Sequence, residues 1–324
     1  MKKIIILVLA TLLLVSCSDK SNNVVDDVSD KTSEVIEGDG KEYTLYLGIL
    51  QDHDASEGKA KFSSTYAAVV CDSKGKIVDC EFDATDDTVI IDGGTVETGG
   101  NYPSKREQGD NYGMKKASSI GEEWYEQADD FADSLEGKTL TEAVKADTTA
   151  GCTIDISGFL GALEAAKNDT QAVTFKSTDE PDASVAVVNS DNGSKNASDE
   201  ADGVAAMTST YAAVAGDNGR ILASAIDVTE TKVYFDTAGL VSSISEGKGK
   251  REMGDSYGMK GASSIGMEWY EQAQYFENYV KGMDASAVSA IKTENGYAAS
   301  ADLSAGCTIN INDFIIAVSK AAKG

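Results

Sequence analysis

An internal repeat dominates this chain of 324 residues. Residues 105–128 read KREQGDNYGMKKASSIGEEWYEQA and residues 250–273 read KREMGDSYGMKGASSIGMEWYEQA, two segments that we call the repeated blocks. STYAAV recurs at 64–69 and 209–214, and AGCT recurs at 150–153 and 305–308. Each copy is too long for a solenoid unit and has the size of a small domain. The sequence therefore predicts two tandem homologous domains.

We expect these domains at residues 42–168 and 183–324, joined by a polar linker over 169–182 that contains Pro181. Alternating apolar residues predict strands over 43–50 and 183–188, and further strands over 88–91 and 231–235. Residues 66–70 and 77–82 predict a hairpin, and Asp217-Asn218-Gly219 is typical of the turn in a second hairpin.

Helices are expected after these strands in each copy. One should begin at Ser118-Ser119 and run toward Leu135, with Ser119 and Glu122 at capping-box spacing. A last helix should follow Ser157, and a similar apolar stripe surrounds Phe314. Strands followed by helices predict an α+β fold, in which each domain is a small antiparallel sheet with helices packed on one face.

Charge and composition exclude several classes of function. The chain carries 28 Lys and Arg against 54 Asp and Glu, a net charge of −26, which argues against nucleic acid as a partner. His53 is the single histidine, so two-His zinc sites are excluded and hydrolase triads are disfavoured. We expect no metal site and no catalytic residue.

The cysteines of the first hairpin are expected to be reduced packing residues. A four-residue turn over 72–75 places Cys80 opposite Ala67, and Cys71 then lies four strand positions, ~13 Å, from Cys80. A disulfide needs Cα atoms within ~7 Å.

The N-terminus predicts export and a lipid anchor. Lys2 and Lys3 precede an apolar run over 4–15 that is too short to span a bilayer, which indicates a signal peptide over 1–16. The run ends in Leu-Val-Ser-Cys, which resembles a bacterial lipobox and implies lipidation of Cys17. An ordinary signal peptide with a chance cysteine is the alternative. Residues 17–41 are polar and predict a flexible tether. We expect a lipid-anchored protein on the bacterial surface or the extracytoplasmic face of the membrane.

A short motif points to a cofactor. Asp147 lies three residues before AGCT in the first copy, and Asp302 does so in the second. The pattern resembles the attachment motif of the FMN-binding domain family, Asp-x-x-Ser/Thr-Gly-Ala-Thr/Ser. In that family a flavin transferase joins FMN to the last hydroxyl. The resemblance implies two covalent FMN groups. It covers the motif, the following helix and, loosely, the preceding strands. Ala and Cys here replace the family's hydroxyl residue and small Ala.

The resemblance implies roles for the motif residues. The acceptor oxygens would be those of Thr153 and Thr308. Glycine lets a backbone approach a phosphate closely, and a helix N-terminus just beyond would favour its charge. The expected cofactor-binding residues of the motif are Asp147, Gly151, Cys152, Thr153, Asp302, Gly306, Cys307 and Thr308.

The repeated blocks supply candidate ring contacts. Their near-identity exceeds what packing alone requires, since core residues exchange at low cost. Aromatic side chains suit an isoalloxazine ring, and the candidates are Tyr112, Trp124, Tyr257 and Trp269. A contact between domains and a loop locked onto its own helix are the alternatives. The motif, too, could be a simple turn in a flavin-free descendant of the fold.

Two classes of function follow. The first is an electron carrier, rather than a catalyst with its own substrate, that exchanges electrons with a membrane redox donor and an external acceptor. The second is a non-redox lipoprotein that binds a ligand or a cell-envelope component with a flavin-free version of the fold.

Overall fold

The computed structural model describes residues 40–148 and 151–323. The predicted signal peptide, Cys17 and the predicted tether up to residue 39 lie outside this part of the chain. Within it, no helix is long and apolar enough to cross a membrane.

The first half of the chain, residues 41–177, contributes an antiparallel sheet in the order β4-β3-β2-β1-β5. Three long strands form its centre, and their bounds are Lys41–Ser56 (β1), Lys59–Asp72 (β2) and Ile77–Asp92 (β3). Short strands flank them at Thr95–Val96 (β4) and Val173–Ser177 (β5). Strand β5 lies inside the segment predicted as a linker and pairs with the start of β1.

The second half, residues 182–323, contributes an antiparallel sheet in the order β6-β7-β8-β9. The strands are Asp182–Ser190 (β6), Gly203–Asp217 (β7), Arg220–Phe235 (β8) and Val241–Glu246 (β9). The predicted turn between β7 and β8 is confirmed, with Asn218 and Gly219 at φ 48° and 72°. A small separate ribbon joins Thr293–Glu294 (β10) to Tyr297–Ala298 (β11).

The helices follow the long strands in each half. The first half has Lys105–Gln108 (α1), Trp124–Asp133 (α2), Leu140–Ala143 (α3) and Ser157–Lys167 (α4). The second half has Lys250–Met253 (α5), Trp269–Tyr279 (α6), Ala285–Ser289 (α7), Ala301–Ser304 (α8) and Asn312–Ala321 (α9). Short 3-10 turns cover Gly109–Asn111, Met114–Lys116 and Gly254–Tyr257. The apolar stripes predicted for the last helix of each half are buried around Phe159 and Phe314. Antiparallel sheets with helices are thus confirmed.

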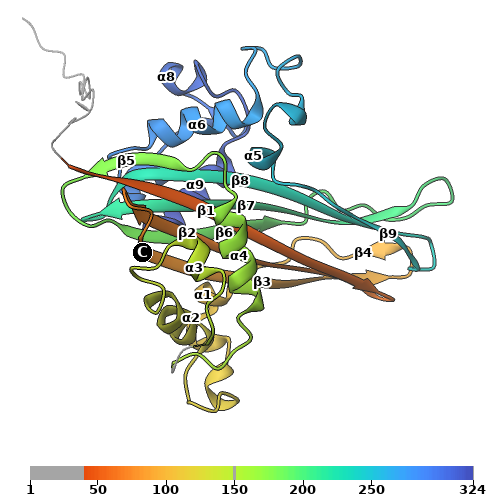
Figure 1. The fold of residues 1–324 in the computed structure, drawn as a ribbon. Helices are drawn as coiled ribbons and strands as arrows, with labels where there is room; N and C mark the ends of the chain where they lie inside the picture. The colour runs from red at the N-terminus through yellow and green to blue at the C-terminus, as the bar shows by residue number, and fades with distance from the viewer. Residues whose placement is uncertain (1–39, 149–150, 324) are drawn as a thin grey trace, which may run out of the picture. The chain divides into compact units, whose positions relative to one another are not determined.

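Each sheet packs helices on one face and the other sheet on its opposite face. Phe82 and Phe159 belong to the core between the first sheet and its helices, and Ile226 and Phe314 to the equivalent core of the second half. A third core lies between the sheets, where the rings of Tyr66 and Tyr211 approach to 5.1 Å between centroids. Figure 1 shows α2 and α6 on opposite sides of the strands.

Side-chain carboxylates connect the two sheets along one edge. Asp79 and Glu81 of β3 accept hydrogen bonds from the backbone N–H groups of Ala183 and Val185 in β6, at 2.5 and 2.8 Å. Strand β6 is the edge of its sheet, so these carboxylates satisfy donors that would otherwise be unpaired. The domain limits at 42–168 and 183–324 remain a prediction. Residues from both sheets contribute to the core between them.

One prediction of local structure was wrong, and a second was right in part, since residues 88–91 and 231–235 are in strands but not in separate ones. Helix α2 begins at Trp124, and its capping box is formed by Glu123 and Glu126, not by Ser119 and Glu122. Ser118 instead accepts hydrogen bonds from the loop and from Gln127. The strands predicted over 88–91 and 231–235 are the ends of β3 and β8, because the long strands continue without a turn.

The predicted register of the first hairpin was also wrong. Cys71 pairs with Ile77 rather than Lys76, and a bulge between Val70 and Cys71 shifts the pairing by one more residue. Cys80 therefore lies opposite Val69 and not Ala67. Cys71 and Cys80 are buried free thiols in the structure. Burial raises the pKa of Cys71 to about 12 and that of Cys80 well above its usual value.

Candidate functional site

The threonine of each AGCT motif is held by a glutamine of the repeated block. The side-chain oxygen of Gln127 accepts hydrogen bonds from the backbone N–H and the hydroxyl of Thr153, at 2.9 and 3.0 Å. Gln272 makes the same two contacts with Thr308, at 2.8 and 3.0 Å. Both glutamines are fully buried. The block and the motif, about 26 residues apart in the first half, therefore form one unit in each half.

The amide nitrogen of each glutamine is bound as well. In the first half it donates to the Ser118 hydroxyl and the Glu122 carbonyl, both at 3.2 Å, and contacts the sulfur of Met114 at 3.6 Å. Gln272 has the equivalent partners Ser263, Met267 and Met259. A side chain with all its polar atoms bound inside a core is rigid. The glutamine thus sets the orientation of the threonine backbone and hydroxyl.

The loop that precedes α2 is bound to the start of that helix. The Glu123 carboxylate accepts hydrogen bonds from the N–H groups of Met114 and Lys115, at 2.8 and 3.0 Å. Glu268 does the same for Met259 and Lys260, at 2.8 and 2.9 Å. Of the three alternatives for the repeated block, these contacts favour a loop locked onto its own helix.

The aromatic candidates surround a lysine. Lys105 Nζ lies 5.2 Å from the ring centroid of Tyr112 and 5.5 Å from that of Trp124. Lys250 takes the same position over Tyr257 and Trp269, at 5.4 and 5.7 Å.

The two tryptophans belong to the cores beneath the sheets. Trp124 packs edge-on against Phe159 and Trp269 against Phe314, and both tryptophans are buried. The structure therefore brings each Tyr–Trp pair together around a cation, with the tryptophan turned into the core.

The cysteines and aspartates of the motif differ in their surroundings. Cys152 and Cys307 are buried in the helix-side cores, and burial raises the pKa of both thiols. Asp147 is exposed, and the backbone carbonyl of Asp302 accepts a hydrogen bond from Tyr275 at 3.1 Å.

The glycines of the motif lie against side chains of α2 and α6. A Cβ on Gly151 would lie 1.7 Å from a carboxylate oxygen of Asp130, and one on Gly306 would lie 2.1 Å from the ring of Tyr275. The close approach that requires glycine is thus made by the protein's own side chains. The Asp155 carboxylate also accepts from the N–H of Ser157, the first residue of α4, at 2.8 Å.

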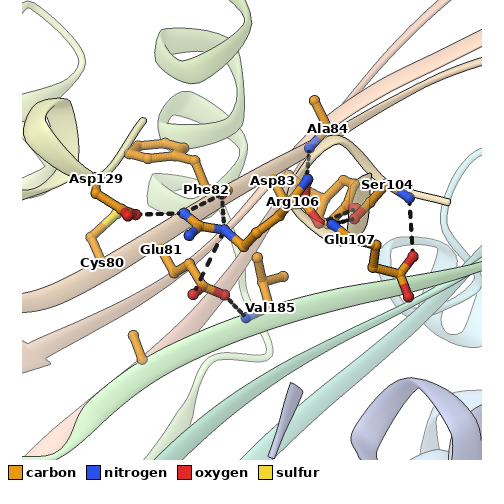
Figure 2. A network of polar contacts seen from close by, with 12 residues as sticks. Cys80, Glu81, Phe82, Asp83, Ala84, Ser104, Arg106, Glu107, Asp129 and Val185 are labelled. Carbon is orange, nitrogen blue, oxygen red and sulfur yellow. Dashed lines mark hydrogen bonds and ion pairs between the residues drawn. The ribbon is translucent and has the colours of Figure 1, made fainter. Parts of the chain in front are cut away.

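The arginine of each repeated block enters a separate network of charged groups, which is partly exposed around Arg106 and buried around Arg251. Figure 2 shows Arg106 between the carboxylates of Asp129 and Glu81, at 2.7 and 3.8 Å, with its side chain also donating to the Phe82 carbonyl. Burial raises the pKa of Glu81 to about 7. In the second half Arg251 pairs with Glu277 at 3.3 Å, and burial raises the pKa of that carboxyl to about 7.

Sequence reasoning missed both glutamines. Gln127 lies on the helical stripe that includes Trp124 and Phe131, where an uncharged polar residue is unexpected. The same residue at the same place in the second block was the available signal. Among the described residues, no cluster of His, Cys, Asp and Glu is suited to hold a metal ion.

The comparisons with known proteins give a partial likeness. The chain is similar to a chlorophenol reductase of Desulfitobacterium hafniense, with 30% identity over 106 residues. This segment is 28% of the chain and 31% of the relative, so the chain spans about a third of that protein's length. No family model matches the chain, and no solved structure gives a significant match.

Proposed function

We propose that this protein is a lipid-anchored extracytoplasmic flavoprotein that carries electrons through two FMN groups, one esterified to Thr153 and one to Thr308. In this proposal the two halves are homologous domains, and a flavin transferase attaches each group. Electrons would come from a membrane redox donor and pass to an external acceptor. Bound FMN supplies the reversible uptake of electrons.

One observation carries the proposal. In each half the hydroxyl of the motif threonine donates to a buried glutamine that also holds the threonine's backbone N–H. The Thr153 side chain is exposed and that of Thr308 is half-buried. A fixed backbone with its hydroxyl near the surface fits a site that a second enzyme modifies. After esterification the glutamine would keep the backbone N–H as its partner.

The fit differs between the halves. The Asp130 carboxylate lies against Gly151, two residues from Thr153, where its charge would repel a phosphodiester. Tyr275 takes that place beside Gly306 and brings a neutral ring. The relative is named as a reductase, which supports a redox role for this protein. The chlorophenol in that name concerns the relative alone.

The test is to produce the chain together with a flavin transferase and measure its mass and absorbance. Each attached FMN should add about 438 Da and absorbance near 450 nm, as the chemistry of the cofactor requires. Thr153→Ala and Thr308→Ala should each remove one adduct, the double variant both, and the nearby control Thr148→Ala none. A colourless chain of unmodified mass from the native host would contradict the proposal and favour a flavin-free binding protein.

A further inference from the structure

Each repeated block contains a surface segment with the sequence Ala-Ser-Ser-Ile-Gly, at residues 117–121 and 262–266, and we call these two segments the tips. Ala117, Ser119 and Ile120 are exposed in the first tip. The second tip has the same pattern of exposure, except that its isoleucine is half-buried. Ile120 is one of the large apolar side chains at the protein surface, with 39% of it exposed.

Packing does not explain why the two tips are identical. Exposed residues exchange at little cost, usually within about 0.5 kcal/mol. Buried residues nearby have changed, because of the seven residues that follow each block, 129–135 and 274–280, only the phenylalanine is the same. Among them the buried Ala132 corresponds to the buried Glu277. The exposed tips thus agree where the neighbouring core does not, which indicates a surface with the same role in both halves.

The two tips also have the same backbone conformation. The Ser118 hydroxyl accepts hydrogen bonds from the backbone N–H groups of Ile120 and Glu122, at 3.3 and 3.4 Å. The equivalent serine of the second tip accepts the same two bonds, both at 3.4 Å. Gly121 ends the first tip with φ 73°, and its equivalent has φ 67°. A partner therefore meets the same preformed shape on each half, and binding does not have to order a loop.

The tips lie next to the motif threonines. The Ser118 hydroxyl accepts a hydrogen bond from the amide nitrogen of Gln127 at 3.2 Å, and the oxygen of the same amide accepts from the Thr153 hydroxyl at 3.0 Å. The second half has the same series of contacts, at 3.2 and 3.0 Å. One buried side chain thus separates each tip from the hydroxyl of its threonine. An enzyme that reaches this hydroxyl comes within contact distance of the tip.

We propose that the tips are the docking surface for the enzyme that esterifies Thr153 and Thr308, and that Ile120 or Ile265 enters an apolar pocket of that enzyme. This inference rests on the proposed function. One enzyme that modifies two threonines needs the same surface beside both, and the tips supply it. A redox partner has no such need, since electrons that enter at one half and leave at the other pass between different partners.

The test measures how the flavin transferase acts on each threonine separately. In a Thr308→Ala chain only Thr153 is available, and initial rates of FMN attachment at increasing chain concentrations give KM and kcat for that site. Ile120→Glu should raise KM about tenfold, because it removes an apolar contact and brings a charge to the pocket. It should leave kcat unchanged, since docking holds the chain equally before and during the reaction. Ile120→Val should keep a KM close to that of the parent.

Matched variants in the other half provide the control. In a Thr153→Ala chain, Ile265→Glu should raise KM for Thr308, whereas Ile120→Glu should not. Leu240→Glu changes an apolar residue that is 65% exposed and lies outside both blocks, so it should leave both sites unaffected.

Two kinds of failure are distinguishable. If the parent chain gains FMN and Ile120→Glu keeps the parent KM or lowers only kcat, the docking surface is wrong and the proposed function stands. The same holds if Leu240→Glu raises KM as much as Ile120→Glu does. If the parent chain gains no FMN at either threonine, the proposed function and this inference are both overturned.

Discussion

The side-chain oxygen of Gln127 binds Thr153 twice, through the backbone N–H and through the hydroxyl. This pair joins the repeated block to the AGCT motif, and the pair Gln272 and Thr308 repeats it in the second half. The unusual identity of the two blocks thus has a structural reason, because the glutamine needs its whole set of partners in place.

Replacing this glutamine should destabilise the protein and loosen the motif. Gln127→Leu leaves the backbone N–H and the hydroxyl of Thr153 without their acceptor, which should lower the free energy of unfolding by about 2–3 kcal/mol. Urea denaturation measures the loss, and hydrogen exchange should show faster exchange at the Thr153 amide. Gln108→Leu removes a single hydrogen bond, to the Pro103 carbonyl, and serves as the control. An unchanged exchange rate at Thr153 would contradict the assignment.

The two motif glycines should differ in their tolerance of alanine. In Gly306→Ala the new Cβ meets the Tyr275 ring, so the ring must move and lose its bond to the Asp302 carbonyl, at a cost of about 1–3 kcal/mol. In Gly151→Ala the exposed Asp130 carboxylate can turn away, so we expect a smaller loss. Thermal denaturation compares the two variants. Adding Tyr275→Ala should restore part of the loss in Gly306→Ala, and equal losses in both glycine variants would argue against the ring contact.

Stability should fall as the pH rises from about 5 to 8. Burial raises the pKa of Glu81 and Glu277 to about 7, and that of Asp87 and Asp227 to about 6. The folded state therefore binds more protons than the unfolded state between the ordinary carboxyl pKa and these values. That proton binding favours folding at low pH and is lost as the pH passes the raised values.

Urea denaturation at several pH values measures this effect. Glu277→Gln should flatten the slope between pH 6 and 8, because it removes one titrating group, while Glu136→Gln on the exposed surface should not. If the parent protein became more stable between pH 6 and 8, the buried carboxyl groups would not control the pH dependence of its stability.

The four cysteine thiols in the described part of the chain should resist modification while the protein is folded. Cys71, Cys80, Cys152 and Cys307 are all buried, and burial raises the pKa of each, so little thiolate forms at pH 8. In a Cys17→Ser chain, a thiol reagent such as DTNB should react only after denaturation. Rapid reaction of the folded protein would mean that one of these residues is accessible.

The sequence predicted well where a few neighbouring residues decide the structure. Asn218 and Gly219 adopt positive φ angles in a two-residue turn because few other residues do so readily. The stripes around Phe159 and Phe314 form helices because their apolar spacing matches the helical period. The start of α2 was misjudged because several residues near Ser119 can cap a helix, and packing of Trp124 selects among them.

By itself, then, the sequence showed the repeat and determined the hairpins and the amphipathic helices. Hairpins and helices depend on contacts between residues close in the chain. Only the tertiary structure decided that the sheets share a core, that Gln127 binds Thr153, and that Arg251 pairs with Glu277. The physical reason is that burial of a polar group is favourable only where a partner of the right kind lies within hydrogen-bond distance. Local preferences carry no information about which distant residue packing will bring there.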